Sequence, residues 1–261
     1  MSSLHLLALG DERQAVVEFA ARLSDADLAA ESAAPGWSVG DVLIHMTATA
    51  RALVTPRVVA LALTRDIERA NAQWVDERRS HTTKHIPGDF ETWSRRCGGG
   101  LSVATAPGLG RLRLRLGELG WYPMELVPAM LVADWHTHLR HDIAPALDRP
   151  VPATDPRRMT TVLTWLIALL ERSHREALGW LDAPVALTLT GPGGGTWRIE
   201  PRRGRIRVRP GRATAAAAHI AALAPEFPQW GTRRLAWRDC AVAVTGDTEL
   251  GARVLDSIDL A

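Results

Sequence analysis

A short stretch of the sequence, ADWHTHLRHDI at residues 133–143, concentrates side chains that bind metal ions. It contains Asp134, His136, His138 and His141, and so three of the nine histidines in the chain. On an α-helix each residue advances by about 100°, so Asp134, His138 and His141 share one stripe and His136 points the opposite way. A carboxylate and an imidazole one turn apart can bind one divalent ion together. The spacing therefore predicts half of a metal site.

The remaining ligand is predicted on a second helix. His45 lies among Val42 and Met46 on an apolar stripe, so its imidazole should face the interior of a helical bundle. A buried imidazole needs a partner, and bundles build metal sites from inward side chains on facing helices. The three ligands His45, Asp134 and His138 would leave at least one open position on Zn(II), which is typical of a catalytic site.

Simpler interpretations of these residues exist. A lone His45 is compatible with a hydrogen-bonded core histidine, and an Asp-x-x-x-His pair occurs by chance in many helices. The helical pattern places both groups on inward faces independently, which favours a joint metal site. For His141 the spacing allows a fourth ligand, an orienting residue or a proton shuttle.

Helices must position these side chains. Ser38 and Asp41 form a capping pair at the start of the helix that carries His45, and the Gly/Pro-containing stretch 98–110 breaks the helical pattern. Long helices joined by loops predict an antiparallel, up-down four-helix bundle. The expected helical segments are 11–29, 38–54, 58–74, 128–147 with Pro128 in its first turn, and 155–178.

The pattern changes after the last of these helices. An Ala-rich helix is expected from Thr214 to about Ala224, and Asp247 is expected to cap a C-terminal helix. The alternating segments VALTLTG, TWRIEP, GRIRVRPG and CAVAVTG predict strands. The fold class is therefore mainly α, with an N-terminal helical bundle at residues 1–180 and a small α+β domain at residues 181–261.

Composition limits the classes of function. Lys and Arg number 31 against 29 Asp and Glu, and the net charge of +2 provides no strong field for nucleic acid or a lipid surface. Cys97 and Cys240 form no Cys-x-x-Cys pair, so we expect reduced thiols in a cytoplasmic protein. No signal peptide is visible, and no segment reaches ~18 uninterrupted apolar residues. We expect no nucleic-acid or membrane partner, and nothing in the sequence indicates an oligomeric state.

Two segments that carry these motifs resemble a known family. PGWSVGDVLIHMTATA followed by DWHTHLRHDIAPALDRP is similar to the DinB-like, mycothiol-dependent maleylpyruvate isomerase family, whose members carry W-(S/T)-V-x-D-x-x-x-H and later an acidic residue four before a His. The tail FPQWGTRRLAWRDCAVAVTGDTELGARVLDSI resembles the C-terminal domain of that family. The resemblance implies a zinc-type site at His45, Asp134 and His138, and a cofactor thiol, mycothiol, between the two domains.

Two features depart from the family pattern. Asp134 stands where Glu is common, which shortens the side chain by one carbon. The Asp of the HDI segment is Asp142, one position later than expected after His138. Either a local bulge absorbs this shift, or His141 has replaced the usual Asp.

The resemblance also implies a chemistry. A divalent cation deprotonates a thiol, and addition of the thiolate to an electron-poor double bond leads to cis–trans isomerisation or to thiol transfer. Arg233 and Arg234, in the segment matching W-x-x-R-R, would bind a carboxylate of the cofactor or substrate, or are simply solvated. We expect a metal-dependent enzyme acting with a small-molecule thiol on an electrophilic substrate. The alternative is a non-catalytic metal- or ligand-binding module of the same fold.

Overall fold

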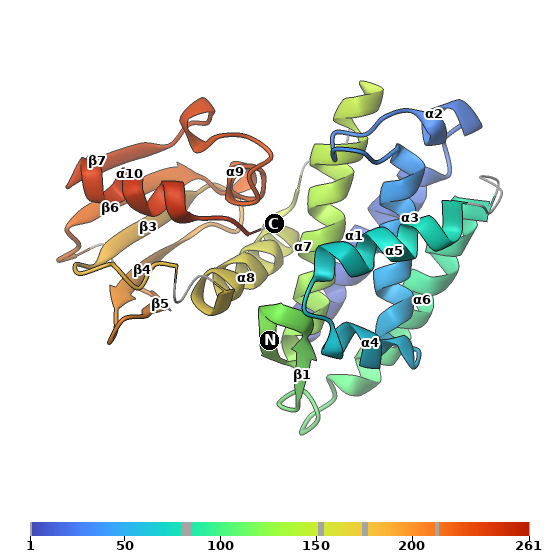
Figure 1. Cartoon of the computed structure of the whole chain (residues 1–261), viewed down its shortest axis with the longest axis horizontal. Coiled ribbons are helices and arrows are strands. Elements are labelled where there is room, and N and C mark those ends of the chain that lie inside the picture. Colours follow the sequence, from blue (N-terminus) through green and yellow to red (C-terminus); the bar gives the residue numbers. More distant parts are fainter. Residues whose placement is uncertain (1, 80–84, 151–153, 174–176, 212–213, 261) are drawn as a thin grey trace. The chain divides into compact units, whose positions relative to one another are not determined.

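The structure is a computed structural model that describes residues 2–79, 85–150, 154–173, 177–211 and 214–260 (Figure 1). The chain forms two compact units, Met1–Ala153 and Thr154–Ala261. This division lies earlier than the boundary predicted at residue 180. The helix α8 (Pro156–Ser173) was expected to close the bundle, but it belongs to the second unit, where it contacts the strand β5 (Ile206–Pro210). An amphipathic helix can cover a sheet as well as other helices, and its periodicity does not distinguish the two.

The first unit is predominantly helical and contains one small hairpin. Its principal elements are α1 (Ser2–Ala20), α2 (Asp25–Ala29), α3 (Val39–Leu53), α4 (Arg57–Leu63), α5 (Ile67–Arg79), α6 (Ile86–Ala104), β1 (Arg113–Leu116), β2 (Gly120–Pro123), α7 (Val127–Thr137) and a π-helical turn at His138–Ile143. The strands β1 and β2 pair antiparallel. The predicted helical bundle is therefore confirmed, with α6 rather than α8 as one of its four long helices.

The directions of the four long helices, α1, α3, α6 and α7, follow from a few contacts. The helices α3 and α6 run the same way, because Gly40 lies beside Ile86 near their starts and Val54 lies beside Gly100 further along. The helices α1 and α7 also run the same way, because His5 lies against the Glu125 carbonyl just before α7 and Glu12 pairs with Arg140 just after it. The helix α3 starts at the end where α7 finishes, because the N–H of Ala33 bonds to the Asp142 carbonyl. Since α4 and α5 return the chain between α3 and α6, the bundle runs up, down, down, up (Figure 1). The helical bundle is as predicted, but its helices do not alternate in direction as the up-down prediction required.

Several predicted helical segments differ in the structure. The segment 11–29 is divided into α1 and α2, and Ser24 caps α2 by accepting the N–H of Asp27. The segment 58–74 is divided into α4 and α5, because Asp66 breaks the run and its Oδ1 accepts the N–H of Arg69 at 2.8 Å. The glycines at 98–100, expected to end a helix, lie inside α6. A Cβ atom at Gly100 would approach Val54 Cγ1 to 2.8 Å, so the close packing of α6 on α3 requires glycine there.

The second unit contains a five-stranded sheet and short helices. Besides α8 and β5, its elements are β3 (Val185–Thr190), β4 (Gly195–Pro201), β6 (Ala218–Leu223), α9 (Phe227–Gly231), β7 (Ala243–Gly246) and α10 (Thr248–Ser257). The strand order is β5-β4-β3-β6-β7. The strands β3 and β6 are parallel, and the other pairs are antiparallel. The helix α10 starts as predicted, since Asp247 Oδ1 accepts the N–H of Leu250 at 2.9 Å.

The prediction of an Ala-rich helix from Thr214 to Ala224 is wrong. This segment contains β6, which lies between β3 and β7 in the sheet. Ala218, Ile220 and Ala222 are buried in alternation with more exposed neighbours, which is the period of a strand. The helical preference of alanine is small and yields to pairing on both edges.

Within the described residues, no single helix combines the length and hydropathy needed to cross a membrane; the pair α3 and α4 passes that test only jointly, with a bend of 101°.

The start of α3 is fixed by the predicted capping pair. Ser38 Oγ accepts the N–H of Asp41 at 3.1 Å, and Asp41 Oδ2 accepts the N–H of Ser38 at 3.0 Å. The same carboxylate pairs with Arg79 of α5 through two contacts of 3.1 Å. Asp41 therefore sets both the first turn of α3 and the position of α5, and His45 follows one turn later.

Replacing Ser38 with alanine should destabilise the protein, because the N–H of Asp41 loses its acceptor. We expect Ser38→Ala to lower the free energy of unfolding by about 1 kcal/mol, measured by urea unfolding followed by tryptophan fluorescence. Ser102→Ala is the matched control, since Ser102 is exposed in α6 and its hydroxyl donates to the Gly98 carbonyl of its own helix. Equal losses in the two variants would contradict the capping role of Ser38.

Candidate metal centre

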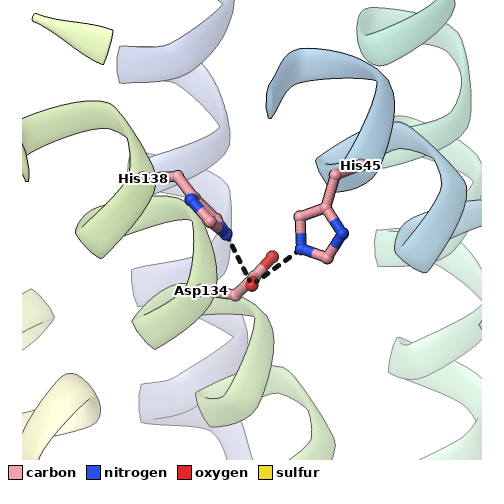
Figure 2. Close-up of side chains that lie close together, drawn as sticks. All are labelled: His45, Asp134 and His138. Carbon is pink, nitrogen blue, oxygen red and sulfur yellow. Dashed lines mark hydrogen bonds and ion pairs between the residues drawn. The ribbon is translucent and has the colours of Figure 1, made fainter. Parts of the chain in front are cut away.

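Side chains from α3 and from the end of α7 meet at one point in the first unit (Figure 2). His45 Nε2 and His138 Nε2 each lie 3.4 Å from the same oxygen, Asp134 Oδ1. The imidazole centroids are 4.9 Å apart and nearly perpendicular. Among the described residues, these three form the group of His, Cys, Asp and Glu side chains whose ligand atoms all lie within 4.8 Å of one another. The structure thus brings together the three predicted ligands, although 89 residues separate His45 from Asp134 in the sequence.

The geometry of this group fits a small divalent cation. Two donors bound to zinc at about 2.1 Å in a tetrahedral arrangement lie about 3.4 Å apart, which equals both observed nitrogen–oxygen distances. The same distance exceeds the usual range of a direct N–H···O hydrogen bond. The second carboxylate oxygen, Asp134 Oδ2, is buried and has no hydrogen-bond partner in the described structure. The donor set of two imidazoles and one carboxylate is also one that zinc accepts.

Charges within the group shift its pKa values in opposite directions. Burial alone would raise the pKa of Asp134, but the adjacent imidazoles of His45 and His138 outweigh it and hold that pKa well below its usual range. Burial alone would lower the pKa of His138, but Asp134 and Asp142 raise that pKa to about 9. In the metal-free protein the Asp134 carboxylate is therefore charged and His138 carries a proton at neutral pH.

The unusual position of Asp142 is explained by the helix that carries it. Residues His138–Ile143 form a π-helical turn, which is the local bulge that the sequence left open as one alternative. Asp142 Oδ2 lies 2.7 Å from His138 Nδ1, and the Asp142 side chain is 1% exposed. The acidic partner of His138 is thus Asp142, and His141 has not taken its place.

The other two histidines of the segment lie outside the three-residue group. The rings of His136 and His141 contact each other, with centroids 6.4 Å apart. His136 is buried and His141 is half-buried. The structure therefore does not bring His141 to the position of a fourth ligand, and its role as a proton shuttle stays a prediction.

Two further residues near the site are informative. The ring of Trp37 lies 5.3 Å from that of His45, centroid to centroid, and covers one side of it.

Glu12 of α1 is fully buried and forms an ion pair with Arg140 in the π-helical turn. Sequence reasoning missed this pair, although Glu12 falls in the apolar stripe of α1 between Ala8 and Val16, at spacings of four. A charged residue in such a stripe indicates a buried partner.

The two arginines predicted to bind a carboxylate lie in the second unit. Arg233 has a left-handed backbone, with φ of 56°, and it pairs with Asp259 at 3.2 Å and donates to the Asp256 carbonyl at 2.7 Å. Arg234 Nη1 donates to Thr232 Oγ1 at 2.9 Å. Arg233 thus holds the C-terminal segment, which sequence reasoning did not foresee.

The fold and the site together define a class of protein. It is a four-helix bundle of up, down, down, up order, with two histidines and a carboxylate from facing helices directed at one point, followed by an α+β unit.

Comparisons with known proteins agree with this class. Residues 9–96 match the family model of the mycothiol maleylpyruvate isomerase N-terminal domain. Two solved structures share the fold: the crystal structure of the mycothiol-dependent maleylpyruvate isomerase, and that of a mutant in which one histidine is replaced by alanine. Each has a TM-score of 0.60 and 14% sequence identity, and covers 94% of this chain and 93% of its own. No curated protein sequence matched the chain.

These comparisons confirm the resemblance predicted from the sequence. Residues 9–96 are similar to the N-terminal domain of the mycothiol maleylpyruvate isomerase family, a DinB-like family, and the chain has the fold of the isomerase. Both comparisons lead to proteins described as enzymes.

The raised pKa of His138 predicts how the stability of the metal-free protein depends on pH. A protonated His138 stabilises the folded state fully below pH 6.5, and this contribution is lost as the pH rises through about 9. We expect the free energy of unfolding to fall over this window by on the order of a few kcal/mol, measured by urea unfolding in the presence of a chelator. The variant His138→Gln cannot titrate, so its stability should change less; parallel pH profiles would refute the assignment.

Proposed function

We propose that this protein is a cytoplasmic, metal-dependent enzyme that uses a small-molecule thiol, mycothiol, in the isomerisation of an electrophilic substrate or in thiol transfer to it. His45, Asp134 and His138 would hold the metal, which we propose to be Zn(II). The observation that carries this proposal is the 3.4 Å distance from each imidazole Nε2 to the same carboxylate oxygen, because it matches the spacing of zinc ligands.

The accessibility of the group also supports a catalytic role. The side chain of His45 is 7% exposed, whereas those of His138 and Asp134 are 12% and 22% exposed. The three donors are therefore largely dry yet can be reached by a ligand. Three protein ligands also leave a position open for one, as in catalytic rather than structural zinc sites.

The chemistry depends on both groups that the chain would bind. The cation, when present, supplies the positive charge that favours the thiolate form of a bound thiol. The thiol supplies a nucleophile for reversible addition to an electron-poor double bond. Asp134 offsets the charge of the cation, Asp142 orients His138, and Trp37 excludes water from one side of His45. We retain Arg233 and Arg234 as the proposed residues that bind a carboxylate of the thiol or the substrate.

Loss of one imidazole should remove the metal. We expect the wild-type protein to carry about one zinc ion per chain, and we expect His45→Ala and His138→Ala each to retain less than a tenth of that amount, measured by mass spectrometry of the dissolved metal after gel filtration. His141→Ala is the matched control, because its ring lies against His136 outside the group, so it should keep the wild-type content. Full metal content in both test variants would contradict the ligand assignment.

The thiol should bind only to the metal-loaded protein. At a mycothiol concentration of one hundred times its Kd, the expected stabilisation is about 2.7 kcal/mol, measured as a rise in melting temperature, with none after chelation or in His138→Ala. The reaction is tested by following maleylpyruvate and free thiol together. Isomerisation with constant free thiol indicates an isomerase, and loss of free thiol indicates transfer. Binding of metal and thiol without turnover of any electron-poor alkene would instead favour the non-catalytic module.

A further inference from the structure

The π-helical turn His138–Ile143 is a local departure from the α-helix that precedes it. Such turns are rare, because their hydrogen bonds reach five residues along the chain, and they occur frequently at functional sites. Here the turn begins at His138, one of the three residues of the site. Asp142, four residues later, also lies in this turn, and its side chain is 1% exposed.

Asp142 makes two contacts that tie the site together. Its side-chain oxygen Oδ2 lies 2.7 Å from His138 Nδ1, and its backbone carbonyl accepts the N–H of Ala33 at 2.9 Å. Ala33 belongs to the loop between α2 and α3, and the same loop carries Trp37, whose ring packs on His45. One residue therefore links the end of α7 to the loop that covers the opposite side of the site.

The two imidazoles of the site are held differently. His45 Nδ1 is buried and has no hydrogen-bond partner in the described structure, so no hydrogen bond at this outer nitrogen orients the ring. His138 Nδ1 has a short contact with a buried carboxylate, which can only accept a hydrogen bond. In the neutral imidazole that a metal ion requires, a proton fixed on Nδ1 leaves the lone pair on Nε2, the atom that faces Asp134 and His45.

We propose that Asp142 is a positioning residue that fixes His138 with Nε2 directed toward the shared ligand position. This inference rests on the proposed metal-dependent function. Carboxylates bonded to the outer nitrogen of a ligand histidine raise its basicity and fix its orientation. The proposed site therefore includes, besides the three ligands, one residue that does not touch the metal.

The test is the isosteric variant Asp142→Asn, which keeps the shape of the side chain and the backbone bond to Ala33 but replaces a charged acceptor with a neutral one. Zinc affinity is measured by competition with a chelating dye. We expect Asp142→Asn to bind zinc about 10- to 100-fold more weakly than the wild-type protein. The exposed Asp148→Asn removes the same charge nearby and should leave the affinity unchanged.

A second measurement begins with the wild-type protein, so its first outcome does not depend on whether a variant folds. In the proton NMR spectrum of the zinc-loaded wild-type protein, the Nδ1–H of His138 should appear as a downfield, slowly exchanging resonance that is absent from His138→Gln. In Asp142→Asn it should move upfield. Absence of this resonance in the wild-type protein, or an unchanged affinity and resonance in Asp142→Asn, would overturn the positioning role of Asp142 but not the proposed function. Failure of the wild-type protein to bind zinc would instead overturn the proposed function, and this inference with it.

Discussion

The half-buried carboxylate of Asp134 organises the first unit. Asp134 Oδ1 faces two imidazoles from different helices, and its other oxygen lies buried without a partner. A carboxylate taken out of water is costly unless opposite charge or hydrogen bonds compensate for it. The contacts with His45 and His138 provide that compensation in the metal-free protein, and a cation would provide more of it. This requirement fixes the level at which α3 must pass α7, since a shift of α3 by one turn would leave the carboxylate without the imidazole of His45.

The scaffold around the carboxylate meets that requirement with further polar contacts rather than with packing alone. Asp41 starts α3 and pairs with Arg79 of α5, which sets the height of His45 one turn later. At the other side, Asp142 joins the end of α7 to the loop before α3. Both ends of the arrangement are therefore set by acidic side chains with defined partners. This favours a site whose geometry is preorganised before any ligand binds.

The elements and residues that could be predicted from the sequence are those governed by local rules. The cap formed by Ser38 and Asp41 and the convergence of three ligands follow from spacings of three and four residues. The strand β6 could not be predicted in this way, because its alanines gain more from pairing with two neighbouring strands than from their own helical preference. The inclusion of Gly100 in α6 depends likewise on a distant residue, Val54. Its side chain packs so closely on α6 that a Cβ atom at position 100 would collide with it. The π-helical turn was only one of two alternatives, because spacing alone does not show which residue reaches His138.

The chain's own cysteines show why a small-molecule thiol is needed for the proposed chemistry. The thiolate is the reactive form of a thiol. Cys97 is fully buried in α6, and its burial raises the pKa of the thiol to about 12. The pKa of Cys240 in the second unit is also raised, first by burial and then by the charges of Glu226 and Asp239. Neither side chain supplies a thiolate at neutral pH. A protein that carries a candidate cation site but keeps both of its own thiols protonated is suited to activating a thiol that it binds, which is the role proposed for mycothiol.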